Sequence, residues 1–177
     1  MRKMTLQQMT FAAILAAVYA VLTVTLPIPQ YGAVQFRLAE ALCVLPFFFP
    51  AATLGLVVGC VIANLFSPFA LWDVPFGSAA TLLACLWTGC LRSRWLAPLP
   101  AVVCNAVIVG AEIALAEVGF GPAFWPAFGF NALTVGGGEL VVCCVLGQLV
   151  LNAVYRTPTL RERIDPVRIG RIRGFKT

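Results

Sequence analysis

The chain has 177 residues, of which 61% are hydrophobic and 11% charged, and its formal net charge is +5. Soluble domains are typically about 25% charged and about 45–50% apolar. Because the apolar excess is spread along the chain in segments of about 16–25 residues, the composition predicts a polytopic membrane protein and leaves no room for a separate soluble catalytic domain.

The first predicted span covers about residues 6–26 and ends at the sequence PIPQYG. It is longer than the apolar core of a signal peptide and no polar cleavage region follows it, so we expect a retained helix. Alanines at a spacing of four share one face of this helix: Ala12, Ala16 and Ala20. Such a strip lets a second helix approach closely, either from a partner or from within this protein.

Residues 38–67 form one long apolar segment, which would overshoot a bilayer core of about 30 Å if it were a single helix. Pro46 and Pro50 interrupt it, and proline breaks the hydrogen-bond ladder of a helix. We therefore expect two short spans, at about residues 37–49 and 51–66, that meet near Pro50.

Three further spans are expected at about residues 74–91, 98–117 and 127–155. The last contains GGGE at residues 136–139. Three glycines weaken a helix by roughly 1 kcal/mol each relative to alanine, and they clear space beside the backbone. The predicted fold class is an all-α integral membrane protein with six transmembrane helices.

Basic residues favour one orientation of these spans. Arg2 and Lys3 precede the first span, Arg92 and Arg94 follow the fourth, and further basic residues follow the sixth. With six spans, all these groups share one side, which the positive-inside rule assigns to the cytoplasm. We therefore expect both termini to be cytoplasmic.

The positive charge is concentrated at the C-terminal end. Residues 156–177 contain seven basic and two acidic residues, whereas residues 1–155 contain five of each. We therefore divide the chain into a six-span transmembrane substrate-binding domain, 1–155, and a basic cytoplasmic tail, 156–177. The tail lacks the interleaved aromatic residues of single-strand nucleic-acid binders, so we expect no nucleic-acid partner.

The cysteines and the absence of histidine bear on metal binding. The chain has seven cysteines, no C-x-x-C pair and no histidine. A zinc site would need a set of thiolates buried in lipid. We therefore expect no metal site and interpret the cysteines as small apolar packing residues.

The acidic residues before the tail all map to the outer half or the midplane of this arrangement: Glu40, Asp73, Glu112, Glu117 and Glu139. The basic residue in the same region is Arg37. A charge at the bilayer centre costs about 2.5–3.5 kcal/mol. Five carboxylates cannot all pair with one arginine, so some are protonated, hydrated or available to an external cation. Such a site, open to the outside, suits a small cationic or donor-rich aromatic solute.

Some of these residues have purely structural alternatives. Arg37 and Glu40 are spaced i, i+3 and could form a scaffold pair. Asp73 suits a helix N-cap with proline soon after it. Glu117 suits a solvated helix end, and Trp125 suits an interfacial aromatic belt.

The remaining polar residues lie deeper in apolar helices. Glu112 and Glu139 are the strongest candidates for contact with a ligand, because burial of an ionisable residue in a membrane usually marks function. Asn64, Asn105 and Asn131 suit hydrogen bonds between helices.

Four stretches of the sequence resemble the QueT family: VQFRLAEALCVLPFFFPAATLGLVVGCVIANLFS, DVPFGSAATLLA, the glutamate of GAEIA and the final GGGE. The resemblance covers most of residues 5–155. Members of this family are substrate-binding S components of energy-coupling factor (ECF) transporters, assigned to queuosine precursors. The resemblance implies an S-component-like six-helix bundle in a bacterial cell membrane that captures its substrate from outside.

The resemblance also implies partners. An S component docks on a shared transmembrane T component that carries two cytoplasmic ATPase subunits. Similar proteins dock through small-residue motifs of the first helix, which here are Ala12, Ala16 and Ala20. The chain has no P-loop sequence, so we expect the partner subunits to hydrolyse ATP, no cofactor in this chain and no enzymatic activity.

The implied ligand is a 7-deazaguanine such as 7-aminomethyl-7-deazaguanine. Its guanine edge offers two adjacent N–H donor groups that one carboxylate can accept, and its aminomethyl group is an ammonium ion that favours a second carboxylate. We expect Glu112 and Glu139 to divide these roles, in either order. The remaining candidates would supply polar contacts or an aromatic face: Glu40, Asp73, Asn131, Arg37, Trp125 and Phe36.

Two other functions are compatible with the sequence. A stand-alone proton-coupled carrier would use the acidic residues as a relay for a small cationic solute, and a membrane-embedded enzyme would use paired carboxylates. The absence of histidine counts against the enzyme. Uptake into vesicles by this chain alone would favour the carrier.

Overall fold

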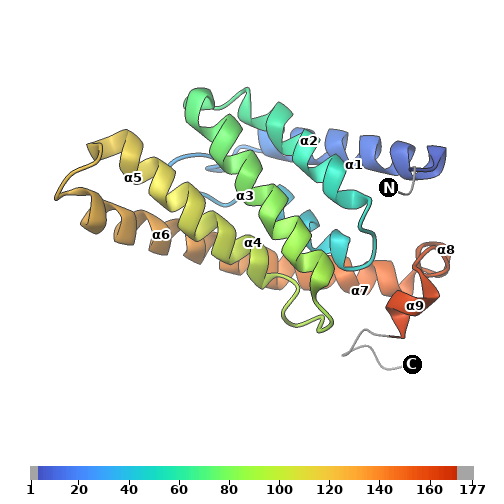
Figure 1. The fold of residues 1–177 in the computed structure, drawn as a ribbon. Helices are drawn as coiled ribbons and strands as arrows, with labels where there is room; N and C mark the ends of the chain where they lie inside the picture. The colour runs from blue at the N-terminus through green and yellow to red at the C-terminus, as the bar shows by residue number, and fades with distance from the viewer. Residues whose placement is uncertain (1–3, 171–177) are drawn as a thin grey trace.

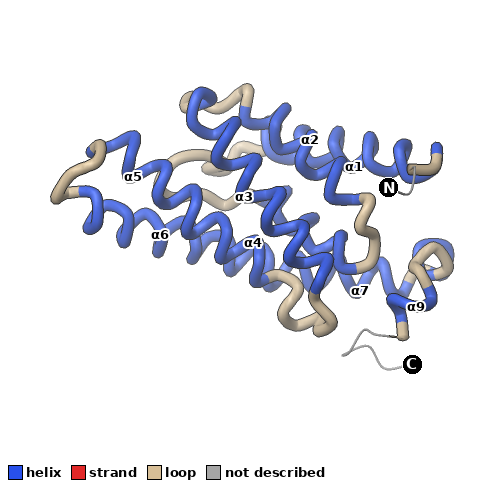
Figure 2. Tube along the Cα trace, viewed as in Figure 1, coloured by secondary structure: helices blue, strands red, loops and turns tan. Residues whose placement is uncertain are grey.

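The computed structural model describes residues 4–170, and within that range it contains helices and loops but no β-strand (Figures 1 and 2). The all-α prediction is confirmed for these residues. Arg2 and Lys3, on which part of the predicted orientation depends, and residues 171–177 of the predicted tail lie outside the described residues.

The first helix, α1 (Leu6–Thr25), begins at a capping box. The Gln8 backbone N–H donates to the Thr5 hydroxyl over 3.3 Å, and the Thr5 N–H donates to the Gln8 side chain over 3.0 Å. These two bonds satisfy amides that the first turn of a helix leaves unpaired. Thus α1 starts and ends close to the predicted boundaries of the first span.

The predicted division of the next segment is confirmed. Loop 26–37 leads into η1 (Leu38–Phe47), a 3-10 helix, which is followed by a turn and then by α2 (Ala52–Asn64). Pro50 lies in the turn, as expected, whereas Pro46 stays inside η1. The 3-10 geometry of η1 was not apparent from the sequence.

Two long helices follow α3 (Ala70–Cys90). One runs over Leu99–Val118 and consists of α4 (Leu99–Cys104), a π-helical segment η2 (Asn105–Val109) and α5 (Gly110–Val118). The other runs over Phe124–Arg156 and consists of α6 (Phe124–Val141), a π-helical segment η3 (Val142–Gly147) and α7 (Gln148–Arg156). Two short helices, α8 (Pro158–Arg161) and α9 (Pro166–Ile169), end the described chain.

Among the described residues, four helices are long and apolar enough to cross a membrane: Leu6–Thr25, Ala70–Cys90, Leu99–Val118 and Phe124–Arg156. The apolar helices η1 and α2 are shorter, with 10 and 13 residues. At 1.5 Å per residue, α2 is about 20 Å long, less than a bilayer core of about 30 Å. The structure therefore has four candidate membrane-spanning helices and two shorter apolar ones.

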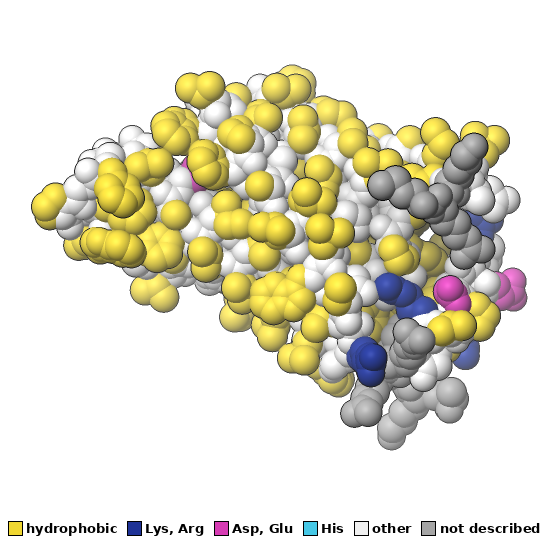
Figure 3. Space-filling model, viewed as in Figure 1, with side chains coloured by type: hydrophobic (Ala, Val, Ile, Leu, Met, Phe, Trp, Pro, Cys, Tyr) yellow, Lys and Arg dark blue, Asp and Glu magenta, His cyan; other side chains and the backbone are white. Residues whose placement is uncertain are grey.

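The two ends of the bundle differ in charge. The start of α1, the loop between α3 and α4, and α8 with α9 lie at one end (Figure 1). The loops after α1, α2 and α5 lie at the other end. Lys and Arg side chains gather at the end that carries α8 and α9, and hydrophobic side chains are spread over the rest of the visible face (Figure 3).

Helix η1 lies at the centre of the bundle. Eight of its ten residues are buried, and it contacts α1, α2, α3, η3 and α7. Four buried cysteines belong to the apolar core around it: Cys43, Cys60, Cys85 and Cys143. This enclosure keeps Glu40, which η1 carries, away from the lipid.

The alanine strip of α1 faces inward. Ala12 and Ala16 are buried against Gly55 and Gly59 of α2. A Cβ atom on Gly55 would overlap the Ala12 carbonyl oxygen, and one on Gly59 would lie 2.7 Å from that of Ala16. We expected the strip Ala12, Ala16 and Ala20 to dock a partner. Its first two residues instead pack inside the protein, against α2, while Ala20 is half-buried.

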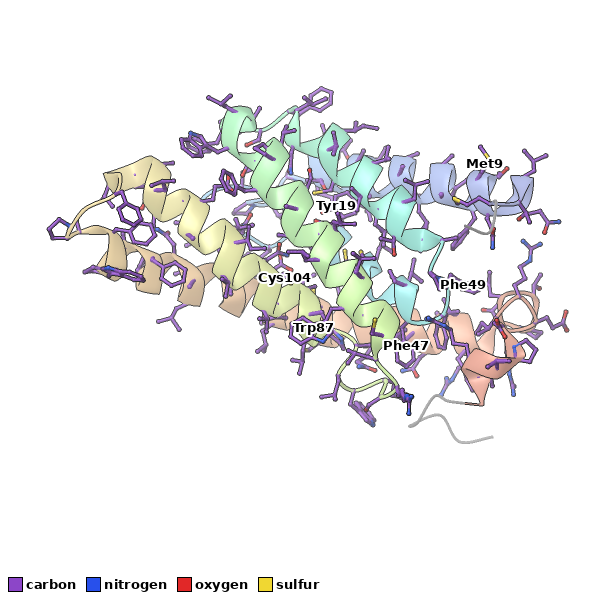
Figure 4. All side chains as sticks on the ribbon, in the orientation of Figure 1. Met9, Tyr19, Phe47, Phe49, Trp87 and Cys104 are labelled. Atoms are coloured by element: carbon purple, nitrogen blue, oxygen red, sulfur yellow. The ribbon has the colours of Figure 1, made fainter. Side chains whose placement is uncertain are left out.

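The first part of the predicted tail folds back onto the bundle. Arg168 Nη1 donates to the carbonyl oxygens of Pro46 and Phe47, each over 2.7 Å, and Nη2 donates to that of Gly89 over 2.9 Å. Ile164 is buried nearby in the core. The guanidinium thus caps the C-terminal ends of η1 and α3, at the end of the bundle where Figure 4 shows Phe47.

Candidate functional site

Four of the predicted acidic site residues are buried: Glu40, Asp73, Glu112 and Glu139. Arg37 is buried with them. They come from loop 26–37, η1, α3, α5 and α6, which the fold brings together between its two ends. The geometry divides these side chains into those that the protein itself satisfies and those that it does not.

Glu40 is satisfied within the protein. One carboxylate oxygen accepts hydrogen bonds from the Tyr19 hydroxyl and, over 3.2 Å, from the Thr81 hydroxyl. The other accepts from Cys43 Sγ over 3.0 Å. Glu40 therefore ties η1 to α1 and α3. Tyr19, which Figure 4 shows within the bundle, was missed by sequence reasoning; a lone tyrosine in an apolar helix was the available signal.

Arg37 also has an internal partner. Its Nη2 donates to Asn64 Oδ1, its guanidinium lies 5.3 Å from the centre of the Tyr31 ring, and its Nε has no hydrogen-bond partner. The Asn64 amide donates in turn to the Asp73 backbone carbonyl over 2.7 Å. Asn64 thus makes the predicted hydrogen bonds between segments. Arg37 and Glu40 make no hydrogen bond with each other, so the structure does not show the alternative scaffold pair.

Asp73 lies in the first turn of α3, so its interpretation as the N-cap is wrong. The N-cap position belongs to Phe69, whose backbone N–H donates to the Ser67 hydroxyl over 3.0 Å. The same hydroxyl donates to the Asp73 carboxylate. Since α3 begins at Ala70, the Asp73 side chain does not cap the helix and can contact another element.

That element is α5. The helices α3 and α5 pack against each other, and the carboxyl groups of Asp73 and Glu112 lie close enough to interact. Glu112 Oε2 is buried and has no hydrogen-bond partner. Two carboxyl groups so close repel each other when both are ionised, unless a proton or another cation lies between them. The pair is therefore suited to a positively charged group.

Glu139 lies deeper, in α6. Its Oε2 accepts a weak hydrogen bond from Cys143 Sγ over 3.3 Å, and its Oε1 has no partner. The side chain of Asn105 lies beside it, and neither amide atom of Asn105 has a hydrogen-bond partner. Asn105 and Glu139 come from neighbouring helices and lie close enough to interact, although no hydrogen bond of good geometry joins them. A carboxylate oxygen, an amide donor and an amide acceptor stand unpaired together.

The GGGE sequence lets loop 26–37 cross α6 beside Glu139. A Cβ atom on Gly138 would overlap the backbone carbonyl oxygen of Gln35 and would lie 3.7 Å from the Phe36 ring. A Cβ atom on Gly136 would lie 3.0 Å from Ala106, whereas one on Gly137 would meet nothing within 4 Å. The close approach of loop 26–37 to α6 therefore depends most strongly on the third glycine, Gly138.

Asn131 and Glu117 lie nearer the end of the helices. The Asn131 amide donates to Glu117 Oε2 over 3.0 Å, which joins α6 to α5 as predicted, while Asn131 Oδ1 is buried without a partner. Glu117 is exposed, in agreement with its interpretation as a helix end.

The two aromatic candidates lie in different places. Phe36 follows Gln35 and lies beside Gly138. Trp125 is 68% exposed and packs at ring-centroid distances of 5.4 and 6.4 Å against Phe124 and Phe128. The structure therefore brings Phe36, and not Trp125, beside the deep part of the acidic region.

Unpaired buried polar atoms mark the region. Leaving such an atom unpaired costs about 1–3 kcal/mol, so a concentration of them indicates a place that a polar ligand can complete. The side chains with such atoms are Gln30, Gln35, Arg37, Ser78, Asn105, Glu112, Asn131 and Glu139. Gln30, Gln35 and Ser78 were missed by sequence reasoning, because single polar residues in loops and helices carry no periodic signal.

Comparisons with known proteins bear on this region. A family model described as QueT transporter matches residues 9–156. The curated Queuosine precursor transporter QueT of Lactococcus lactis subsp. cremoris (strain MG1363) is 36% identical over 85 residues, which cover 47% of this chain and 50% of that protein. The match thus spans half the length of that relative. No solved structure matches the chain.

Proposed function

Since the chain belongs to the QueT transporter family, a family of transporters and not of enzymes, we propose that it captures a queuosine precursor for an energy-coupling factor importer. The proposed ligand is 7-aminomethyl-7-deazaguanine, bound from the outside. The observation that carries this proposal is the pair of buried carboxylates, Glu112 and Glu139, that each keep an unpaired oxygen. The name of the curated relative supports the class of substrate.

Charge balance supports a cationic ligand. Among the described residues, four buried carboxyl groups share one buried guanidinium, that of Arg37. One guanidinium balances the charge of one carboxylate, so three of the four carboxyl groups are left without a balancing cation. An ammonium group supplies one positive charge, and a guanine edge supplies N–H donors to a carboxylate.

The proposed topology has six crossings and two cytoplasmic termini in a bacterial cell membrane. The loops alternate between the two ends of the bundle (Figure 1), and this alternation supports six crossings when η1 and α2 are counted as the second and third. The gathering of basic side chains at the end that carries α8 and α9 supports its orientation (Figure 3).

The proposed partners are a T component and two ATPase subunits that hydrolyse ATP for transport. Because Ala12 and Ala16 are covered by α2, the proposed docking face is the adjacent side of α1, about 100° around the helix, where Ala13 and Ala17 are exposed at a spacing of four. Exposed small residues at this spacing let a partner helix approach closely.

The experiment that tests the proposal measures binding and uptake separately. Calorimetry on the purified chain should show saturable binding of 7-aminomethyl-7-deazaguanine. Uptake into proteoliposomes should require the T component, the ATPase subunits and ATP. Uptake by this chain alone, driven by a pH gradient, would instead establish the proton-coupled carrier, and absence of binding would contradict the proposed substrate.

A further inference from the structure

We infer an orientation for the ligand, which rests on the proposed function: its guanine edge meets Glu139 and Asn105, and its ammonium arm lies between Asp73 and Glu112. Both pairs join two helices. They differ in chemistry, since one combines a carboxylate with an amide and the other combines two carboxyl groups.

The deeper pair matches a guanine edge. That edge presents one carbonyl acceptor beside two N–H donor groups. Glu139 Oε1 is an unpaired acceptor, and Asn105 Nδ2 is an unpaired donor, and both side chains are at least 99% buried. The carboxylate can therefore accept from the two N–H groups while the amide donates to the carbonyl. In this arrangement every polar atom of the edge has a partner.

The outer pair matches an ammonium group. Asp73 and Glu112 are both buried on the packed helices α3 and α5, their carboxyl groups lie close enough to interact, and Glu112 Oε2 has no hydrogen-bond partner. The Ser67 hydroxyl already donates a hydrogen bond to Asp73, so it is not available to a guanine carbonyl. A cation placed between the two carboxyl groups removes their mutual repulsion and donates to both.

The spacing of the two pairs agrees with one small ligand. Asn105 and Glu112 lie seven residues apart on one continuous helix, which is about 10 Å along its axis. Both are buried, and the helix packs on α3 and α6, which carry Asp73 and Glu139. A bicyclic ring with a short arm can reach from one pair to the other. In the reverse orientation the guanine carbonyl would meet the carboxyl groups of Asp73 and Glu112 and not the amide donor of Asn105.

The test compares two ligands that differ at the arm. Calorimetry on the full-length protein would use 7-aminomethyl-7-deazaguanine and the neutral 7-cyano-7-deazaguanine. Glu112→Gln and Asp73→Asn should each weaken binding of the amine by about 10- to 100-fold while changing binding of the nitrile less than about threefold. Glu139→Gln and Asn105→Leu should weaken binding of both ligands alike. Glu162→Gln changes an exposed glutamate after α8, at the other end of the bundle, so it serves as the control and should change neither.

The outcomes separate the orientation from the proposed function. If Glu139→Gln lost the amine selectively and Glu112→Gln lost both ligands, the orientation would be reversed although the function would stand. If all four variants lost both ligands alike, or if none lost either, the orientation would also be overturned. If the wild-type protein bound neither ligand, the proposed function itself would fail. Two variants for each pair keep the test valid where one of them does not fold.

Discussion

The buried glutamates of this protein differ in their hydrogen-bond partners. Both oxygens of Glu40 accept hydrogen bonds from the protein, whereas Glu112 and Glu139 each keep an oxygen without a partner. A buried carboxylate that is fully hydrogen-bonded stabilises the fold around it, and one with a free acceptor remains available to a ligand. The hydrogen-bond donors around each carboxylate, and not its burial, therefore distinguish the structural glutamate Glu40 from the ligand candidates Glu112 and Glu139.

Replacement of Tyr19 by phenylalanine tests this separation. The change removes one donor from buried Glu40 without a change of shape, so we expect the free energy of unfolding to fall by about 1–3 kcal/mol. Ligand affinity should change little. Thermal unfolding in detergent and calorimetry would measure the two quantities, with Thr10→Ala as a control at an exposed hydroxyl. A loss of affinity without a loss of stability would place Glu40 among the ligand contacts.

At the scale of the elements, close backbone approach determines two positions. Gly138 of α6 lets loop 26–37 pass beside Glu139, and Gly55 of α2 lets α1 pack closely. Both depend on the absence of a Cβ atom at the contact and not on backbone torsions. The small residues therefore position the candidate site indirectly, through the elements that surround it.

The glycines of the GGGE sequence provide a matched pair of variants. Gly138→Ala should lower stability by about 1–3 kcal/mol and weaken ligand binding, because the new Cβ atom would displace loop 26–37 at Gln35. Gly137→Ala meets open space and should be neutral or stabilising by up to about 1 kcal/mol. Thermal unfolding and calorimetry on both variants check this. Equal effects would mean that the loop does not depend on this contact.

The two faces of α1 should respond differently to a large side chain. Ala17→Trp changes an exposed position, so it should abolish uptake by the assembled transporter while leaving ligand binding intact. Ala16→Trp would collide with α2 at Gly59 and should destabilise the protein by several kcal/mol. Uptake and binding would be measured for both. Normal uptake by Ala17→Trp would exclude docking through this face.

At the scale of the whole molecule, residues 156–170 of the predicted tail pack against the helical bundle. Arg168 bonds the ends of η1 and α3, so the last described segment closes one end of the bundle. The acidic region lies between that end and the opposite set of loops. This arrangement agrees with entry of a ligand from the end that lacks the basic cluster.

Labelling of introduced cysteines checks this orientation. In a background without native cysteines, Phe120→Cys should react with a membrane-impermeant reagent added outside intact cells, because Phe120 is exposed in the loop after α5. Gly170→Cys should react only after the membrane is permeabilised. Outside labelling at position 170 would contradict two cytoplasmic termini.

The sequence by itself predicted the helical class, the break near Pro50 and the set of acidic residues within apolar helices, because length, hydropathy and proline act locally. It did not identify which helix faces meet. In a chain that is apolar on nearly every side, the face of α1 that carries Ala12 and Ala16 is no different in hydropathy from the face that carries Ala13 and Ala17. Only the tertiary structure assigned the first face to α2, gave Glu40 its donors from Tyr19 and Thr81, and left Glu139 and Asn105 unpaired, because these partners come from segments distant in sequence.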